Sequence, residues 1–119
     1  MPRMKTYGGG CHCGKVRYEV SFDLGTVMAC NCSICGKRGT LLAFVTPDQF
    51  KLLKGDDALT DYQFNTMNIH HLFCTTCGIG SFGRGTGPGG KAMVAVNTRC
   101  LDDVDVKALE VKWFDGKSL

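Results

Sequence analysis

Hydrophobic and polar positions alternate most clearly over KVRYEVSF, residues 15–22. One face of this segment collects the apolar side chains of Val16, Tyr18, Val20 and Phe22. Because successive side chains of a strand point to opposite faces, a period of two predicts a half-buried strand. TLLAFV (40–45) is a nearly continuous apolar run with β-branched residues, which predicts a more buried strand.

The segment TPDQFKLL (46–53) has the signals of a helix start. Thr46 is suited to cap a helix, Pro47 to occupy its first position, and Gln49 to complete a capping box. We therefore expect one or two helical turns here, ended by Gly55.

Later segments alternate between strand-like runs and turn residues. The predicted strands are LTDYQF (59–64), NIHHLF (68–73), AMVAVNTRCL (92–101) and ALEVKWF (108–114), and GRGTGPGG (83–90) is expected to be a flexible loop. No linker or low-complexity segment interrupts the chain. The pattern predicts a mainly β fold with one short helix, in a single domain over residues 1–119.

Composition and charge narrow the classes of function. The 119 residues are 44% hydrophobic and 21% charged, which is typical of one globular domain. The net charge of +3 comes from scattered lysines and arginines, so nucleic acid is not an expected partner and a small anion fits better. The N-terminus lacks the apolar run of a signal peptide, and no stretch is long and apolar enough to span a membrane. We expect a cytoplasmic protein whose cysteines stay reduced and bind metal.

Seven of the eight cysteines fall in three clusters: CHCG (11–14), CNCSICG (30–36) and CTTCG (74–78). In each cluster the last cysteine is followed by a glycine, namely Gly14, Gly36 and Gly78. A glycine permits the positive φ of a tight turn whose backbone N–H groups point at a metal-bound sulfur. The recurrence predicts metal-binding turns.

Two of the clusters together supply four ligands. The spacing of Cys74 and Cys77 lets both sulfurs reach one ion, and a C-x-C strand points Cys11 and Cys13 to one face. These four residues are a candidate structural zinc site, and such a site contributes on the order of 10 kcal/mol to folding in small peptides. The alternatives are free core thiols or disulfides.

The remaining cluster holds three ligands, because Cys30, Cys32 and Cys35 can all face a second zinc ion. Water or substrate would occupy the fourth position, which is the arrangement of a catalytic site. One alternative is a second structural zinc completed by Cys100 or a histidine. Another is a redox C-x-x-C pair at 32–35, although no βαβ pattern surrounds it.

The remaining cysteine and the three histidines are not assigned to either metal site. Cys100 lies in a strand-like segment and is expected to be a buried small hydrophobe. His70 and His71 are adjacent in a predicted strand, so only one can point toward any given site, and we expect both to be structural or solvent-facing. His12 is flanked by two proposed ligands and should point away from their metal.

The order C-x-C, C-x-C-x-x-C and C-x-x-C-G, with GGCHCGKVRYEV, HHLFCTTCGI and VNTRCLDDVD, resembles the family of glutathione-dependent formaldehyde-activating enzymes. Centromere protein V carries the same domain. The likeness runs from Gly9 to about Trp113 and implies a β-tent fold of several small antiparallel sheets. It also implies that Cys11, Cys13, Cys74 and Cys77 hold a structural zinc, and that Cys30, Cys32 and Cys35 hold a catalytic, labile one.

The activity implied by the resemblance joins glutathione and formaldehyde into S-hydroxymethylglutathione, the reverse of a carbon–sulfur lyase reaction. Glutathione is a net anion at neutral pH, and Lys37 and Arg38 follow the third thiol after a single glycine, so they are candidate carboxylate anchors. A solvated surface pair is the alternative for these two cations. A non-catalytic zinc module that binds a protein or a thiol metabolite is the alternative for the whole chain.

Overall fold

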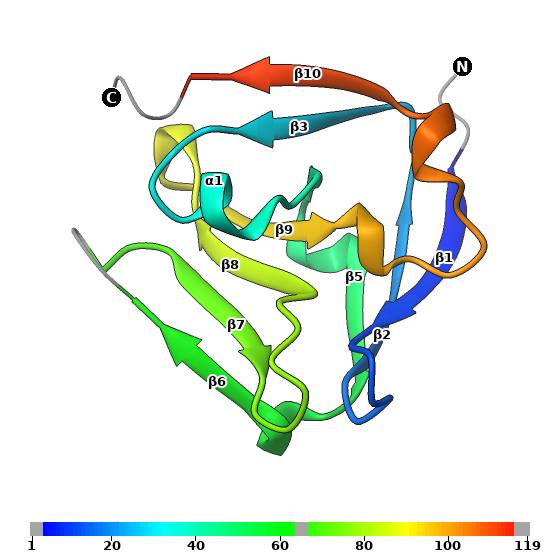
Figure 1. Cartoon of the computed structure of the whole chain (residues 1–119), viewed down its shortest axis with the longest axis vertical. Coiled ribbons are helices and arrows are strands. Elements are labelled where there is room, and N and C mark those ends of the chain that lie inside the picture. The colour runs from blue at the N-terminus through cyan, green and yellow to red at the C-terminus, as the bar shows by residue number, and fades with distance from the viewer. Residues whose placement is uncertain (1–3, 64–66, 116–119) are drawn as a thin grey trace.

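The computed structural model describes residues 4–63 and 67–115, and most of them lie in two β-sheets (Figure 1). The smaller sheet has three antiparallel strands in the order β1 (Lys5–Gly10), β2 (Arg17–Phe22) and β5 (Phe50–Lys54). The larger sheet has seven strands in the order β10 (Glu110–Phe114), β3 (Thr26–Cys30), β4 (Leu42–Val45), β9 (Ala92–Asn97), β8 (Phe82–Thr86), β7 (His70–Cys74) and β6 (Leu59–Tyr62). All its neighbouring strands are antiparallel except β10 and β3, which are parallel. The predicted mainly β class is confirmed.

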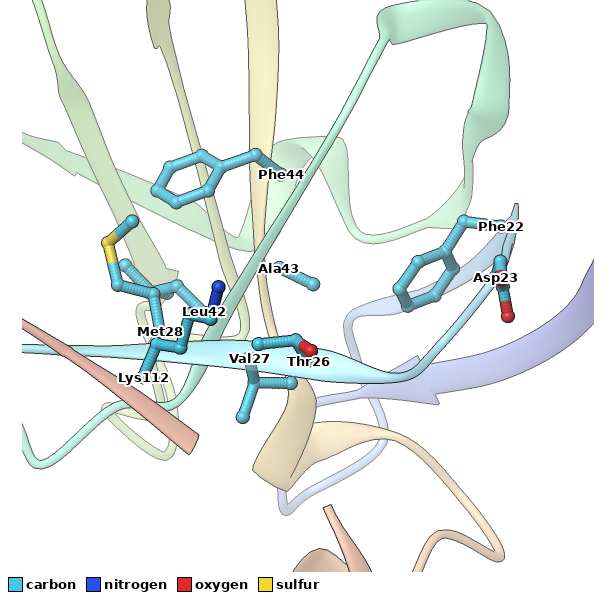
Figure 2. Close-up of a pocket in the computed structure, with 9 residues that line it drawn as sticks. All are labelled: Phe22, Asp23, Thr26, Val27, Met28, Leu42, Ala43, Phe44 and Lys112. Atoms are coloured by element: carbon cyan, nitrogen blue, oxygen red, sulfur yellow. The ribbon is translucent and has the colours of Figure 1, made fainter. Parts of the chain in front are cut away.

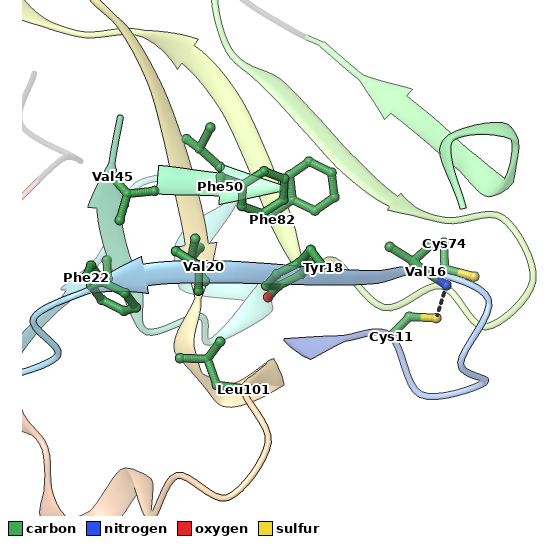
Figure 3. Packing of buried hydrophobic residues seen from close by; sticks show 13 residues of the cluster. Cys11, Val16, Tyr18, Val20, Phe22, Val45, Phe50, Cys74, Phe82 and Leu101 are labelled. Atoms are coloured by element: carbon green, nitrogen blue, oxygen red, sulfur yellow. Dashed lines mark hydrogen bonds between the residues drawn. The ribbon is translucent and has the colours of Figure 1, made fainter. Parts of the chain in front are cut away.

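The main hydrophobic core lies between the two sheets (Figure 3). Tyr18 is fully buried at its centre, where its ring centroid lies 4.9 Å from that of Phe50 and 5.7 Å from that of Phe82. The Tyr18 hydroxyl donates a hydrogen bond to the backbone carbonyl of Ser81, 3.0 Å away. Val16 and Val20 are also buried, so the alternation predicted for residues 15–22 is confirmed.

A second, smaller cluster lies beside β3 and β10. Val27, Ala29 and Leu41 form its buried part, and Leu109 and Val111 pack against them. The turn η5 (Val106–Ala108) brings Leu109 to the start of β10. The other short turns are η1 (Pro47–Gln49), η2 (Asp56–Ala58), η3 (Pro88–Gly90) and η4 (Thr98–Cys100).

The helix predicted for residues 46–53 is wrong beyond its first turn. The capping box of Thr46 and Gln49 is present, but it starts only the 3-10 turn η1, and β5 follows. Phe50 and Leu52 take positions opposite Val20 and Tyr18, so burial in the sheet overrides the local helix signal. The α-helix of the described residues is α1 (Cys35–Arg38) instead, within the second cysteine cluster.

Other predicted elements differ from the structure in their extent, and the strand predicted for 92–101 ends at Asn97, where the turn η4 follows. The expected loop at 83–90 is strand β8 up to Thr86 and then includes the turn η3, and β1 and β3 were not predicted. Phe44 is 46% exposed, so β4 is half-buried rather than buried. Phe64, the last residue of the strand predicted for 59–64, lies outside the described residues. None of the described helices has the length and apolar character needed to cross a bilayer.

Candidate metal centres

The four-thiol cluster lies where the two sheets meet at one end of the core. Cys11 and Cys13 follow β1, Cys74 ends β7, and Cys77 lies in the turn after it. The Sγ atom of Cys13 lies 3.6 Å from that of Cys11 and 3.7 Å from that of Cys74. All four Sγ atoms lie within 4.8 Å of one another.

These distances fit zinc. With zinc–sulfur bonds of about 2.3 Å, the corners of a tetrahedral four-sulfur site are about 3.8 Å apart. None of the eight cysteines is in a disulfide, so the four sulfurs are available as ligands. Cys11, Cys13, Cys74 and Cys77 are therefore the residues that would hold the structural ion.

Backbone groups hold the sulfurs of this cluster in place. The N–H of Val16 donates to Cys11 Sγ at 3.3 Å (Figure 3), and the N–H of Cys77 donates to Cys74 Sγ at 3.5 Å. Hydrogen bonds from the backbone of Cys13 and Ile79 lower the pKa of Cys77 to about 6. Such bonds favour the thiolate form that a metal requires.

The turns of this cluster depend on glycine as predicted. Gly14 and Gly78 have φ values of 85° and 79°, a region that other residues rarely adopt. Gly36 does not fit this pattern, because it lies inside α1 and its N–H donates to the carbonyl of Cys32. The positive φ in that part of the chain belongs to Gly39, which caps the C-terminal end of the helix.

The three-thiol cluster lies where β3 leads into α1. Cys30 ends the strand, Cys32 lies in the loop, and Cys35 is the first helical residue. Their Sγ atoms lie within 4.8 Å of one another, and all three residues are half-buried. The N–H of Cys32 donates to Cys30 Sγ at 3.4 Å, and the N–H of Cys35 donates to Cys32 Sγ at 3.5 Å.

The thiols of this cluster differ in acidity. Burial and then the neighbouring Cys32 raise the pKa of Cys35. Burial also acts to raise the pKa of Cys32, but hydrogen bonds from the backbone of Cys35 and from the other two thiols outweigh it and lower the pKa overall. Negative charge therefore develops more readily on Cys32 than on Cys35.

No fourth histidine, cysteine or carboxylate joins these three thiols in the ranges 4–63 and 67–115. Cys100 is half-buried and lies near the four-thiol cluster. Burial, followed by the charges of Cys11 and Cys77, raises its pKa to about 11. The amide of Asn97 donates to Cys100 Sγ at 3.5 Å. Cys100 as a fourth ligand of the second zinc is thus wrong.

Neither of the two adjacent histidines joins the three thiols, and the two lie on opposite faces of β7. His70 Nδ1 lies 2.6 Å from Asp61 Oδ2, so His70 is part of a surface pair. The ring of His71 lies 6.4 Å from that of Tyr62, and burial followed by the charge of Arg38 lowers its pKa. A second zinc site closed by either histidine finds no support in this geometry.

The two candidate carboxylate anchors form the last turn of α1. Lys37 and Arg38 are both exposed there, one turn after Cys35. Arg38 extends toward the start of β8, because a Cβ added at Gly80 would lie 2.7 Å from one of its guanidinium nitrogens. Both residues therefore lie in the helix that begins at Cys35, and their role as carboxylate anchors stays a prediction.

A cavity of about 230 Å³ opens between β3 and β4, on the Thr26 side of the point where these strands pair (Figure 2). These strands are paired at Met28 and Leu42, and beyond that pair they diverge. The side chains of Met28, Leu42 and Phe44 line the cavity, with Asp23 and Lys112 among the lining residues. Met28 is two residues before Cys30 and shares its face of β3. Sequence reasoning missed this cavity because it depends on strand register.

Comparison with known proteins agrees with this arrangement. A family model described as glutathione-dependent formaldehyde-activating enzyme matches residues 6–115. The crystal structure of a Rhodobacter sphaeroides protein superposes with a TM-score of 0.79 at 34% sequence identity, covering 90% of this chain and 99% of that one. With the family match spanning nearly the whole chain and both cysteine clusters assembled, the protein belongs to the family of glutathione-dependent formaldehyde-activating enzymes.

Proposed function

We propose that the protein is a zinc-dependent lyase-type enzyme that acts on thiol adducts, with glutathione and formaldehyde as its substrates. The observation that carries this proposal is the three-thiol cluster, which has no fourth ligand among the described residues. Cys30, Cys32 and Cys35 would hold the catalytic zinc. When bound there, zinc supplies a positive charge that lowers the pKa of an incoming thiol and polarises a carbonyl.

The proposed reaction balances without an oxidant or reductant. The thiol sulfur forms a bond to the aldehyde carbon, the carbon–oxygen π bond breaks, and the proton lost by the thiol ends on the new hydroxyl group. Lys37 and Arg38 supply positive charge for the carboxylates of glutathione.

The test measures the exchange between free glutathione and its hydroxymethyl adduct with ¹³C-labelled formaldehyde by NMR, because adduct formation also proceeds without a catalyst. The zinc-loaded protein should raise the exchange rate above that of the protein-free solution. Cys32→Ala should remove this increase. Cys100→Ala is the matched control, since Cys100 lies outside the three-thiol cluster, and it should leave the increase intact.

Two results would contradict the proposal. One is an exchange rate that the protein does not change. The other is an increase that survives Cys32→Ala. If calorimetry then showed that the protein binds glutathione without accelerating exchange, the non-catalytic zinc module would be the better description.

A further inference from the structure

β10 forms one edge of the larger sheet (Figure 1). β3 lies on one side of it, and no described strand lies on the other. The carbonyl of Phe114 accepts a hydrogen bond from the N–H of Asn31 at 3.2 Å, so Phe114 directs its backbone groups toward β3. Because alternate residues of a strand direct these groups to opposite sides, Val111 and Trp113 direct theirs away from the sheet. Such an edge is a template for another strand.

The side chains on this edge are unusually apolar for a surface. Trp113 is the only tryptophan of the chain, and it is 82% exposed. Phe114 beside it is 43% exposed. Exposed large aromatic residues are enriched in protein interfaces, where their area is covered by a partner. Trp113 shares its face of β10 with Val111, and Leu109 precedes them in the same alternation.

The residues of β10 are complementary to themselves. We propose that β10 pairs antiparallel with β10 of a second copy of the chain, about a two-fold axis at Val111. On one face, Glu110 then lies opposite Lys112 of the second copy, and the reverse pair follows from the symmetry. On the other face, Trp113 lies opposite Leu109 of the second copy, and the two Val111 side chains meet at the axis.

The charges select this register over its neighbour. An axis at Lys112 would place the two Lys112 ammonium groups opposite each other, and like charges at directly opposed positions are destabilising. With the axis at Val111, the two Val111 residues exchange both backbone hydrogen bonds. The N–H of Trp113 then meets the carbonyl of Leu109 of the second copy. The backbone hydrogen bonds, the charge pairs and the apolar contacts therefore all favour the register with the axis at Val111.

This interface goes beyond the proposed function, but it adjoins the three-thiol cluster. Phe114 is paired with Cys30 in the β10–β3 ladder. The side-chain amide of Asn31 donates to Asp115 Oδ1 at 3.0 Å. A second copy on β10 would therefore hold the strand that supports the loop of the thiols.

The first experiment measures mass and tryptophan environment together as the concentration is raised from about 1 μM to about 1 mM, the range over which a small interface forms. Sedimentation should show the mass rising from 12.9 kDa to twice that value. The emission of Trp113 should move to shorter wavelength, and acrylamide should quench it less, over the same range. A monomer at every concentration with a fully quenched tryptophan would overturn the proposal.

The second experiment tests the register by exchanging charges. Lys112→Glu places carboxylates opposite each other at both positions and should weaken association by at least about tenfold. Adding Glu110→Lys restores opposite charges and should restore the dimer. Lys51→Glu on β5 makes the same change of charge in the other sheet and should have no effect. A dimer that Lys112→Glu leaves unchanged, or that the exchanged pair does not restore, would refute this register.

Discussion

At the scale of single residues, two thiols of the four-thiol cluster are more deeply buried than any thiol of the three-thiol cluster. Cys74 is only 1% exposed and belongs to the main hydrophobic core together with Cys11. Cys30, Cys32 and Cys35 are half-buried and belong to neither hydrophobic cluster. Cys11 and Cys74 are therefore core residues as well as candidate metal ligands, whereas the thiols of the second group can be changed with little loss of packing.

This difference predicts opposite effects of two substitutions. Cys74→Ser removes a zinc ligand and places a hydroxyl in the core, so it should abolish cooperative thermal unfolding, because structural zinc contributes on the order of 10 kcal/mol in small domains. Cys32→Ala should keep a cooperative transition. Its melting temperature should lie within a few degrees of the wild-type value, which is the shift expected for a loss of about 1 kcal/mol. Circular dichroism during heating measures both. A Cys74→Ser variant that melts like the wild type would mean that the structural site is misassigned.

Arg38 provides a second prediction at this scale. If its guanidinium binds a carboxylate of glutathione, Arg38→Ala should raise the KM for glutathione about tenfold, the loss expected for one charge-assisted hydrogen bond. The KM for an uncharged thiol such as 2-mercaptoethanol should stay the same. Lys51→Ala on β5 removes one positive charge elsewhere and is the control. Equal changes for both thiols would indicate that Arg38 only stabilises the region around Gly80.

At the scale of elements, β1 shows how glycines allow two strands to approach closely. β1 ends in Gly8, Gly9 and Gly10. A Cβ at Gly9 would lie 2.9 Å from the ring of Tyr18, and a Cβ at Gly10 would lie 2.0 Å from the carbonyl oxygen of Val16. Because these glycines have no side chains, the end of β1 can lie close to Tyr18 and Val16 next to the four-thiol cluster.

Gly10→Ala should consequently destabilise the protein by about 2–3 kcal/mol, since the neighbouring backbone has to move. Urea denaturation of the zinc-loaded protein measures this loss. Gly25→Ala is the matched control, because no atom lies within 4 Å of a Cβ at Gly25, and its effect should be close to zero. Equal stability of the two variants would show that the contact between Gly10 and Val16 relaxes at no cost.

Some elements could be predicted from the sequence because their signal is local. β2 follows from its period of two, and the ligand clusters follow from cysteine spacing. β1 could not be predicted, since the reason for its glycines is the Tyr18 ring on another strand. The helix signal at Thr46 was real but was outweighed by the burial of Phe50 beside Val20. The secondary structure of these two segments therefore depends on packing against distant residues, which the local sequence pattern does not show.

The candidate site divides in the same way. Local spacing predicted the three thiols, and the described residues confirm that they lie together. Two other features depend on how distant strands align. One is the position of Cys100 outside the three-thiol cluster, and the other is the cavity between β3 and β4. Neither could be derived from spacing alone.

At the scale of the whole molecule, the two clusters connect the fold differently. The four-thiol cluster joins positions 61 residues apart, as in the contact of Cys13 with Cys74, and it links the end of β1 in the small sheet to the end of β7 in the large one. The three-thiol cluster links only the end of β3 to the start of α1. An ion bound at the first cluster would therefore hold two sheets together, whereas an ion at the second would hold only one loop.

Gradual addition of a chelator to the zinc-loaded protein should thus give two separate phases. The first ion should leave with no change in circular dichroism but with loss of the catalysed glutathione exchange, because the three-thiol cluster has only three protein ligands and lies outside the core. The second ion should leave together with unfolding, since binding energy at such a site is folding energy. A colorimetric zinc indicator and circular dichroism, followed on the same sample, measure both. Cys32→Ala should show the second phase alone, and release of both ions in a single step would contradict the separate roles of the two clusters.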